Sequence, residues 1–246
     1  MSLTGKRAVI TGGGSGIGAD MALTFASAGA EVTIIGRREA ALKSVADQHR
    51  GIQFSVVDVT DEAAMVAFFA QLSRVDIVVA NAGAAESAPF AKTSLEQWQR
   101  MLNVNLSGVF LTLREGLKQL NDGGRLIAVA STAGLKGYAY VGAYCAAKHG
   151  VVGLVRALAI ETATRNITVN ALCPGFTDTP LLAASVDTIV AKTGQSAEQA
   201  TSHFESTNPT GRLVTPAEVS ATALWLCGPH SSAITGQAIS ISGGEV

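Results

Sequence analysis

The 246-residue sequence has little charge of either sign and no long uninterrupted apolar run. Charged residues make up 15% of the chain and the formal net charge is −1, so we expect neither nucleic acid nor a membrane surface as a partner. No apolar stretch reaches the roughly 18 residues of a transmembrane helix, which predicts a chain without a membrane span. The first residues lack a signal-peptide pattern, so we expect a cytoplasmic protein.

Cysteine and histidine are also scarce, and neither type clusters. The three cysteines, Cys145, Cys173 and Cys227, stand in separate apolar contexts, which predicts reduced thiols in a cytoplasm. The four histidines are isolated and no His/Cys group has metal-ligand spacing, so we expect no metal site. Hydrophobic residues make up 48% of the sequence, which indicates a packed globular protein.

Short apolar runs alternate with helical patterns along nearly the whole chain. Seven runs have the composition of buried strands: residues 7–11, 32–35, 52–57, 75–80, 124–130, 167–172 and 238–241. Helical periodicity occupies most intervals between them: residues 21–28, 38–49, 61–72, 94–120, 144–166 and 216–225. Because crossover connections are right-handed, this order predicts a doubly wound parallel sheet of the Rossmann type, with helices on both faces, formed by residues 1–246 as a single domain.

Residues 179–212 interrupt this alternation. The segment is rich in Ala, Ser, Thr and Gln and has no strand pattern. A long segment of this kind after a strand is typical of a lid over a binding site. An ordinary pair of surface helices is the alternative.

A glycine-rich turn joins the first strand to the first helix, with glycines at positions 12, 13, 14, 16 and 18. Glycine allows a sharp turn and lets backbone N–H groups approach a pyrophosphate at the positive end of a helix. The spacing departs from the Gly-x-Gly-x-x-Gly dinucleotide motif, and a tight turn without a ligand is the alternative. We expect the cofactor to contact this turn through the following residues: Gly12, Ser15, Gly16, Ile17 and Gly18.

Two arginines follow the second strand, where an NAD site usually places an acidic residue. Gly36 occupies that position here, and Arg37 and Arg38 come next. Arginines just before a helix oppose its dipole, whereas a 2′-phosphate would suit their guanidinium groups. We therefore predict a preference for NADP(H), with NAD(H) and a solvated arginine pair as the alternative.

Tyr144 and Lys148 stand four residues apart in a helical pattern, so their side chains share one face of the helix. A nearby cation favours the phenolate, so we expect Lys148 to lower the pKa of Tyr144. A tyrosine with such a pKa can act as a general acid or base. On the pair alone, a surface tyrosine beside a solvated lysine is the alternative.

Several motifs together resemble those of the short-chain dehydrogenase/reductase family over essentially the whole chain. They are Thr11-Gly12-x-x-x-Gly16-x-Gly18, Asp58-Val59, Asn81-Ala82-Gly83, Asn105, Ser131, Tyr144-x-x-x-Lys148 and Pro174-Gly175. The resemblance implies an enzyme with an NAD or NADP cofactor, and usually a homotetramer.

The resemblance also implies a role for each site residue. In a tetrad of Asn105, Ser131, Tyr144 and Lys148, Tyr144 would give a proton to the carbonyl oxygen and Ser131 would hold that oxygen. Lys148 would lower the pKa of Tyr144 and bind the nicotinamide ribose, and Asn105 would position a water. The remaining cofactor contacts would be Asp58 and Val59 at the adenine, Asn81 and Gly83 along the channel, and Pro174, Thr177 and Thr179 near the carboxamide or phosphates.

The substrate is less directly indicated. The sequence is similar to 3-hydroxybutyrate dehydrogenases in some stretches and to reductases of 3-oxoacyl thioesters in others. The positions that hold the substrate carboxylate in the former are Ala85, Ala133 and Val141 here. This difference favours a 3-oxoacyl thioester over a free acid, unless a cation arrives from one of three residues: Lys136, Lys192 or Arg212. The alternatives are an NAD-dependent dehydrogenase of a secondary alcohol or 3-hydroxy acid, and a non-catalytic cofactor-binding sensor.

Overall fold

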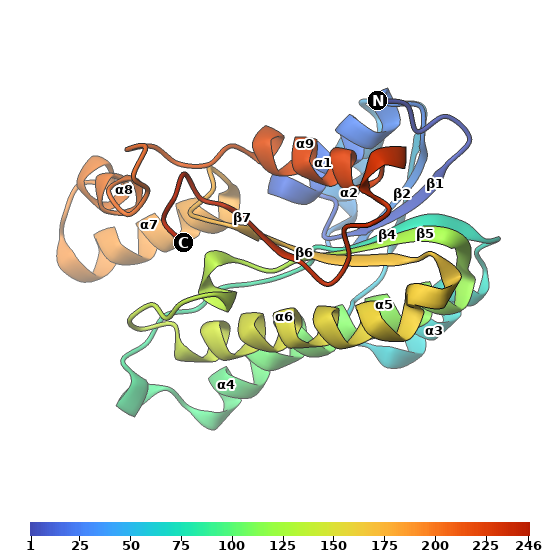
Figure 1. Ribbon diagram of the computed structural model, residues 1–246. Coiled ribbons are helices and arrows are strands. Elements are labelled where there is room, and N and C mark those ends of the chain that lie inside the picture. The colour runs from blue at the N-terminus through green and yellow to red at the C-terminus, as the bar shows by residue number, and fades with distance from the viewer.

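Seven parallel strands form one sheet in the computed structural model, which describes residues 1–246 (Figure 1). The strands are β1 (Arg7–Thr11), β2 (Glu31–Gly36), β3 (Ile52–Val56), β4 (Val75–Ala80), β5 (Leu120–Val129), β6 (Thr168–Pro174) and β7 (Ala238–Ile241). Their order across the sheet is β3-β2-β1-β4-β5-β6-β7, and every pair is parallel. The predicted doubly wound sheet is confirmed, and its order reverses between β1 and β4.

Helices cover both faces of this sheet (Figure 1). One face carries α1 (Gly16–Ser27), α2 (Glu39–Ala46) and α9 (Pro216–Leu226); the other carries α3 (Glu62–Ala70), α5 (Gly108–Gln119) and α6 (Gly142–Thr162), with α4 (Leu95–Leu102) packed against α6. Each face buries its own hydrophobic cluster, with Phe25 fully buried on the first and Phe69 on the second. Burying one such phenyl group stabilises the fold by about 2–3 kcal/mol.

The predicted helix over residues 94–120 is divided in two by a turn of π-helix, Asn103–Ser107. The Asn105 side chain is fully buried in this turn, and its Nδ2 donates to the carbonyl oxygens of Met101 and Ala84 at 3.0 and 2.9 Å. A wide turn of this kind inside a helix is common at functional sites. The fifth strand also begins earlier than expected, at Leu120 instead of residue 124.

Residues 179–212 contain a helix pair, α7 (Pro180–Thr193) and α8 (Ala197–Glu205), which lies at one end of the sheet (Figure 1). Few of its side chains are buried; Leu182, Val186 and Ala200 are the buried ones within the helices. Phe204 ties α8 to the body, because its ring lies 4.7 Å from that of Phe176. A movement of this pair as a lid stays a prediction.

Helix α6 and its extension to Arg165 are long and apolar enough to cross a membrane by length and composition alone. Lys148 and Arg156 interrupt this helix, so it contains no uninterrupted apolar run of about 18 residues. In the fold, 44% of the most apolar window is buried, and Val151 and Val155 pack into the core beside β6. These contacts identify α6 as a helix of the protein core that packs against the sheet.

Candidate active site

The predicted site residues gather where the strands end. The turn from Gly12 to Gly18 follows β1, Arg37 and Arg38 follow β2, Asp58 and Val59 follow β3, Asn81 and Gly83 follow β4, Ser131 follows β5, and Thr177 and Thr179 follow β6, which ends at Pro174. In open α/β sheets, ligands bind at the carboxyl ends of the strands beside the point where the strand order reverses. The sheet thus brings residues from six strands to one edge.

The glycine-rich turn packs against the end of β4 so closely that two of its residues can only be glycine. Gly12 has φ +67°, and a Cβ there would lie 2.8 Å from the Cα of Ala82. A Cβ on Gly18 would lie 2.5 Å from the carbonyl oxygen of Gly12. The hydroxyl of Thr11, at the end of β1, holds the residues after β4 in place, because it accepts from the backbone N–H groups of Asn81 and Ala82 at 2.9 and 3.0 Å.

The first residue of the helix-pair segment also reaches this turn. A Cβ on Gly16 would lie 3.2 Å from the Cγ2 of Thr179, so the two are in contact. The Thr179 hydroxyl caps α7 by accepting from the N–H of Leu182 at 3.4 Å. Thr177 is buried and donates to the carbonyl oxygen of Gly175 at 2.9 Å. The chain after β6 therefore runs beside the N-terminus of α1.

The two arginines follow β2, and Arg37 reaches toward Asp58 after the neighbouring strand β3. Nη2 of Arg38 donates to the hydroxyl of Ser15 at 2.9 Å, which brings one guanidinium group to the glycine-rich turn. Nη1 of Arg37 lies 3.9 Å from Oδ2 of Asp58, and 73% of the Arg37 side chain is exposed. An exposed pair at that distance contributes little stability. Both arginines are exposed, and their remaining N–H groups can meet an anion at this end of the site.

Lys148 is the one charged group of the predicted tetrad, and it is buried, at 3% exposure. Its Nζ donates to the carbonyl oxygen of Val129 at 2.8 Å and lies 5.5 Å from the ring centre of Tyr144. A Cβ on Gly83 would lie 3.8 Å from this Nζ and 2.9 Å from Oδ1 of Asn105. Asn105 and Lys148 therefore both lie beside Gly83, and Tyr144 lies beside Lys148.

Ser131 approaches Tyr144 from the end of β5. It caps a short 3-10 turn, Thr132–Gly134, through a hydrogen bond from the N–H of Ala133 to its Oγ at 3.1 Å. Its hydroxyl is close enough to the Tyr144 phenol to affect the pKa of that group. All four tetrad residues are thus brought together from three different parts of the chain.

The charge state of Tyr144 differs from the sequence-based expectation. Burial opposes the charged phenolate and raises the pKa of Tyr144 to about 12, although the Ser131 hydroxyl acts in the opposite direction. Burial also lowers the pKa of Lys148 to about 8, since its cation is held away from water. The expected lowering of the Tyr144 pKa by Lys148 is therefore not found in this structure. A neutral phenol at pH 7 is a proton donor.

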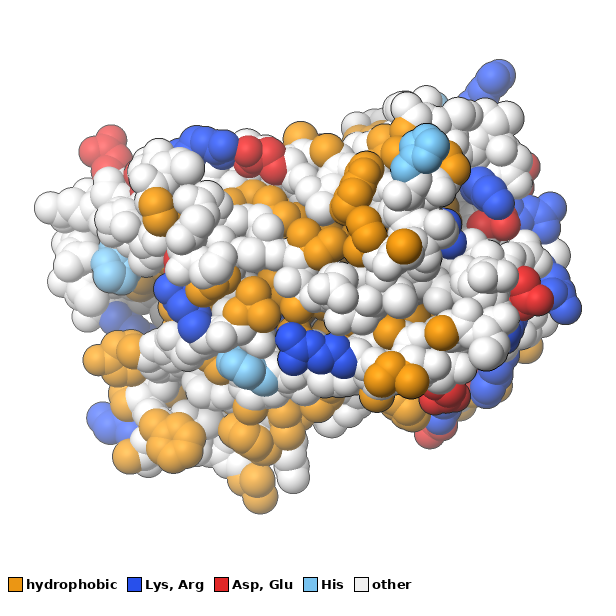
Figure 2. Space-filling model, viewed as in Figure 1, with side chains coloured by type: hydrophobic (Ala, Val, Ile, Leu, Met, Phe, Trp, Pro, Cys, Tyr) orange, Lys and Arg blue, Asp and Glu red, His pale blue; other side chains and the backbone are white.

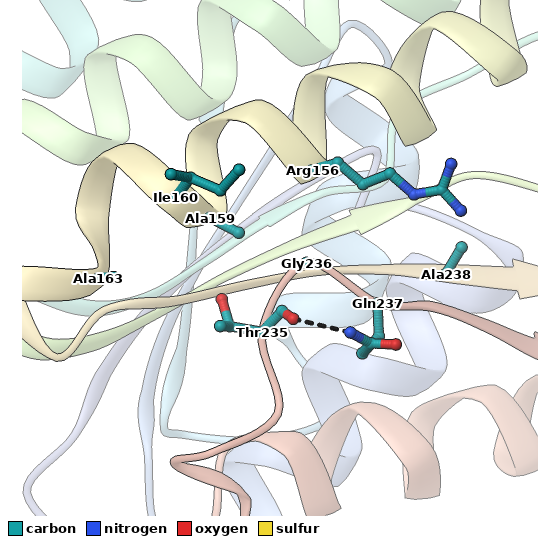
Figure 3. A pocket seen from close by; sticks show the side chains of 8 residues that line it. All are labelled: Arg156, Ala159, Ile160, Ala163, Thr235, Gly236, Gln237 and Ala238. Carbon is teal, nitrogen blue, oxygen red and sulfur yellow. Dashed lines mark hydrogen bonds between the residues drawn. The ribbon is translucent and has the colours of Figure 1, made fainter.

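The cavity in Figure 3 lies away from this edge and holds none of the predicted site residues. Its volume of about 610 Å³ is within the range of small-molecule pockets. It is lined by Arg156, Ile160 and neighbours on α6 and by residues 235–238, at the amino end of β7. Arg156 is twelve residues beyond Tyr144, or roughly 18 Å along the helix. This cavity is open to the surface and is not the active site.

Comparison with known proteins agrees with this geometry. The family model described as enoyl-(acyl carrier protein) reductase matches residues 12–245. The chain is 36% identical to the D-beta-hydroxybutyrate dehydrogenase of Cupriavidus necator, over 99% of both chains. It is 33% identical to the 3-oxoacyl-acyl-carrier-protein reductase FabG of Chlamydia trachomatis, over 98% of both. A crystal structure of an actinorhodin polyketide ketoreductase variant with NADPH has 33% identity and a TM-score of 0.91, covering 100% of this chain and 99% of that one.

These matches extend over nearly the whole chain and identify the fold as that of dinucleotide-binding oxidoreductases. The chain belongs to the short-chain dehydrogenase/reductase family. It is an oxidoreductase that interconverts a ketone and an alcohol with a nicotinamide cofactor. The sequence prediction of family, fold and reaction class is confirmed.

Proposed function

We propose that this protein is an NADP(H)-dependent reductase of 3-oxoacyl thioesters, with Tyr144 as the proton donor. The observation that carries the reduction is the position of Tyr144 between Ser131 and Lys148, with its pKa raised to about 12. A phenol with that pKa keeps its proton at neutral pH and can give it to the oxygen of a ketone undergoing reduction. Ser131 would hold the same oxygen as negative charge develops on it.

The carboxyl edge of the sheet fits a dinucleotide. The cradle at Gly12 and Gly18 leaves no room for a side chain, and the N-terminus of α1 lies directly behind it. Bound there, the cofactor supplies or accepts the hydride. Lys148 would hold the nicotinamide ribose, while Asp58, Val59, Asn81 and Gly83 would line the path of the cofactor between β3 and β4.

The preference for NADP(H) rests on the two arginines. Arg38 reaches the hydroxyl of Ser15 and Arg37 lies over Asp58, so both flank the position that Gly36 leaves open. A 2′-phosphate at this point would receive two charge-assisted contacts, whereas the ribose hydroxyl of NAD(H) would meet no carboxylate from Gly36. The NADPH in the structure of the related polyketide ketoreductase supports this assignment.

The thioester assignment rests on the cations available to a free carboxylate. Lys136 is engaged by Glu245 at 3.0 Å, and Arg212 is engaged by Glu218 through two contacts, at 2.6 and 3.0 Å. Lys192 is exposed near the end of α7. An unpaired carboxylate in a closed site is costly, so a ketone on a neutral carrier group is favoured over a free keto acid.

The helix pair α7 and α8 would close over the substrate. The N-cap residue of α7, Thr179, touches the glycine-rich turn at Gly16, and Phe204 of α8 packs on Phe176 beyond the end of β6. A few residues therefore attach an otherwise exposed segment to the site, as expected for a lid.

A second copy of the chain would cover the outer side of α6 and β7. Strand β7 is an edge strand, and Ile160 on α6 is 82% exposed beside the cavity of Figure 3. Figure 2 shows several separate apolar patches on this side of the molecule, among polar and basic side chains. Covering an edge strand and exposed apolar side chains favours association, and we propose a homotetramer in the cytoplasm.

The experiment that tests the function is a substrate panel with both cofactors. Acyl thioesters, free ketones, free keto acids and secondary alcohols would be compared by their kcat/KM from absorbance at the nicotinamide band. We expect the highest value for a 3-oxoacyl thioester with NADPH. Highest values for a 3-hydroxy acid or another secondary alcohol with NAD would instead identify the alternative dehydrogenase. The family relatives, which are reductases and dehydrogenases, leave the non-catalytic sensor without support.

A further inference from the structure

Glu245, the last residue but one, reaches back to the chain segment that carries Ser131. Its side chain is 2% exposed, and Oε1 accepts from the phenol of Tyr138 at 2.6 Å and lies 3.0 Å from Nζ of Lys136. Glu245 and Tyr138 are 107 positions apart in the sequence. Two residues of the segment between Ser131 and Tyr144 are therefore held by one carboxylate from the end of the chain.

A second hydrogen bond leads from Tyr138 to the turn that Ser131 begins. The Tyr138 phenol oxygen lies 2.6 Å from Oγ1 of Thr132, which is 2% exposed. Since the single phenol proton goes to Glu245, the Thr132 hydroxyl donates to Tyr138. Thr132 is the neighbour of Ser131 and the first residue of the 3-10 turn whose cap is the Ser131 hydroxyl. The path from Glu245 to Ser131 is thus continuous.

The surroundings of Tyr138 fix its ring as well as its hydroxyl. The ring packs edge-on against Phe176 at 5.5 Å and lies under Nζ of Lys136 at 5.1 Å. Burial and the Glu245 carboxylate raise the pKa of Tyr138 above its usual value, so the phenol remains a neutral donor. Because the Tyr138 ring is held on two sides, its hydroxyl keeps a fixed position between Glu245 and Thr132.

The remaining oxygen of Glu245 argues against a purely stabilising role. Oε2 is buried without a hydrogen-bond partner, and a Cβ on Gly175 would lie 3.3 Å from it. A buried carboxylate oxygen without a donor opposes folding. The carboxylate lies against the backbone at Gly175, where β6 ends. Its contacts with Tyr138 and Lys136 therefore explain its placement better than a contribution of its own to stability does.

We propose that Glu245 is a positioning residue for the reaction, which orients the Ser131 hydroxyl toward the substrate oxygen through Tyr138 and Thr132. The inference rests on the proposed role of Ser131. It is independent of the thioester assignment, because the same hydroxyl would hold the oxygen of any ketone. Loss of the contact lets the Ser131 turn move, which weakens the hydrogen bond to the developing charge while cofactor binding at the glycine-rich turn stays intact.

The test compares Glu245→Ala, Glu245→Gln, Tyr138→Phe and the double variant Tyr138→Phe/Glu245→Ala on the ketone that the wild type reduces best. We expect Glu245→Ala to lower kcat about tenfold, with KM for the cofactor and its Kd within twofold of wild type. Glu245→Gln retains an acceptor for Tyr138 and should keep most of kcat. The double variant should resemble Tyr138→Phe alone, since both act along one path.

Two controls separate the possible failures. Glu161→Gln removes an exposed carboxylate on α6 and should leave kcat unchanged. If Ser131→Ala keeps wild-type kcat, both the proposed role of Ser131 and this inference are wrong. If Ser131→Ala is inactive but Glu245→Ala keeps kcat within twofold, only the inference is overturned. Multiplicative losses in the double variant, or a loss in Glu245→Ala that follows its melting temperature alone, would overturn it as well.

Discussion

The amine of Lys148 lies 5.5 Å from the centre of the Tyr144 ring, one helical turn away, and donates its hydrogen bond to the carbonyl oxygen of Val129 instead of the phenol. The pair therefore combines a neutral phenol with a buried cation that is easily deprotonated. This arrangement suits reduction, in which the phenol gives up a proton, more than oxidation, in which it must accept one. Alcohol oxidation should accordingly accelerate as pH rises above neutrality.

Replacing Tyr144 by phenylalanine should abolish nearly all turnover. The change removes one hydroxyl and leaves the ring, so the fold and the cofactor site should survive. General acid catalysis contributes about 10²–10⁴-fold, and we expect kcat to fall by that factor. Fluorescence titration should give a Kd for NADPH close to wild type. A kcat near the wild-type value would remove Tyr144 from the mechanism.

Replacing Lys148 by methionine should remove activity without loss of stability at pH 7. The pKa of Lys148 falls from 10.5 to about 8 on folding, so the buried cation costs about 3 kcal/mol below pH 8. The unfolded chain binds more protons between these values, so this cost disappears as pH rises from 8 to 10.5. Denaturant unfolding should show a variant as stable as wild type, or more so, at pH 7, with the difference shrinking toward pH 10. A variant clearly less stable at pH 7 would contradict this.

Neutralising Arg37 and Arg38 should weaken the use of NADPH selectively. Losing a charge-assisted contact to a phosphate typically costs about 1.5–3 kcal/mol, so the double Arg→Gln variant should lose at least tenfold in kcat/KM for NADPH. Values for NADH should change little, and Arg50→Gln, at an exposed arginine, serves as the control. Equal losses with both cofactors would show that the arginines do not contact the 2′-phosphate.

Two glycine substitutions should have opposite effects. Gly18→Ala places a Cβ 2.5 Å from the carbonyl oxygen of Gly12, so the turn must shift and cofactor affinity should fall at least tenfold. Gly153→Ala, inside α6, meets no atom within 4 Å and should stabilise the fold by about 0.5–1 kcal/mol. Melting curves with and without NADPH measure both effects. A Gly18→Ala variant that binds NADPH normally would argue against the cradle.

The sheet could be predicted because its strands are continuous apolar runs, such as Ile77 to Ala80, that alternate with helical patterns. The start of β5 could not, because Asn121 to Gly124 have the composition of a loop. They form an irregularity in the strand, between Leu120, which pairs with Val75, and Arg125, which pairs with Ile77. The π-helical turn at Asn105 could not be predicted from the sequence either. It depends on a hydrogen bond to Ala84, whose position is set by the end of another strand.

The tetrad residues could be predicted from their motifs, but their electrostatics could not. Tyr144 and Lys148 are correctly placed by their spacing, yet the direction of the Tyr144 pKa depends on burial, which spacing does not report. Glu245 was not recognised for a similar reason. Nothing in the last residues of the sequence indicates that the carboxylate returns to Lys136 and Tyr138.

The most direct test of the account compares acetoacetyl-CoA with acetoacetate, using NADPH and one assay for both. With Lys136 and Arg212 engaged by glutamates, a free carboxylate has no prepared cation, and we expect at least a tenfold higher kcat/KM for the thioester. A higher kcat/KM for acetoacetate would contradict the thioester assignment. It would also require a cation, with Lys192 the first to examine, to reach the substrate carboxylate.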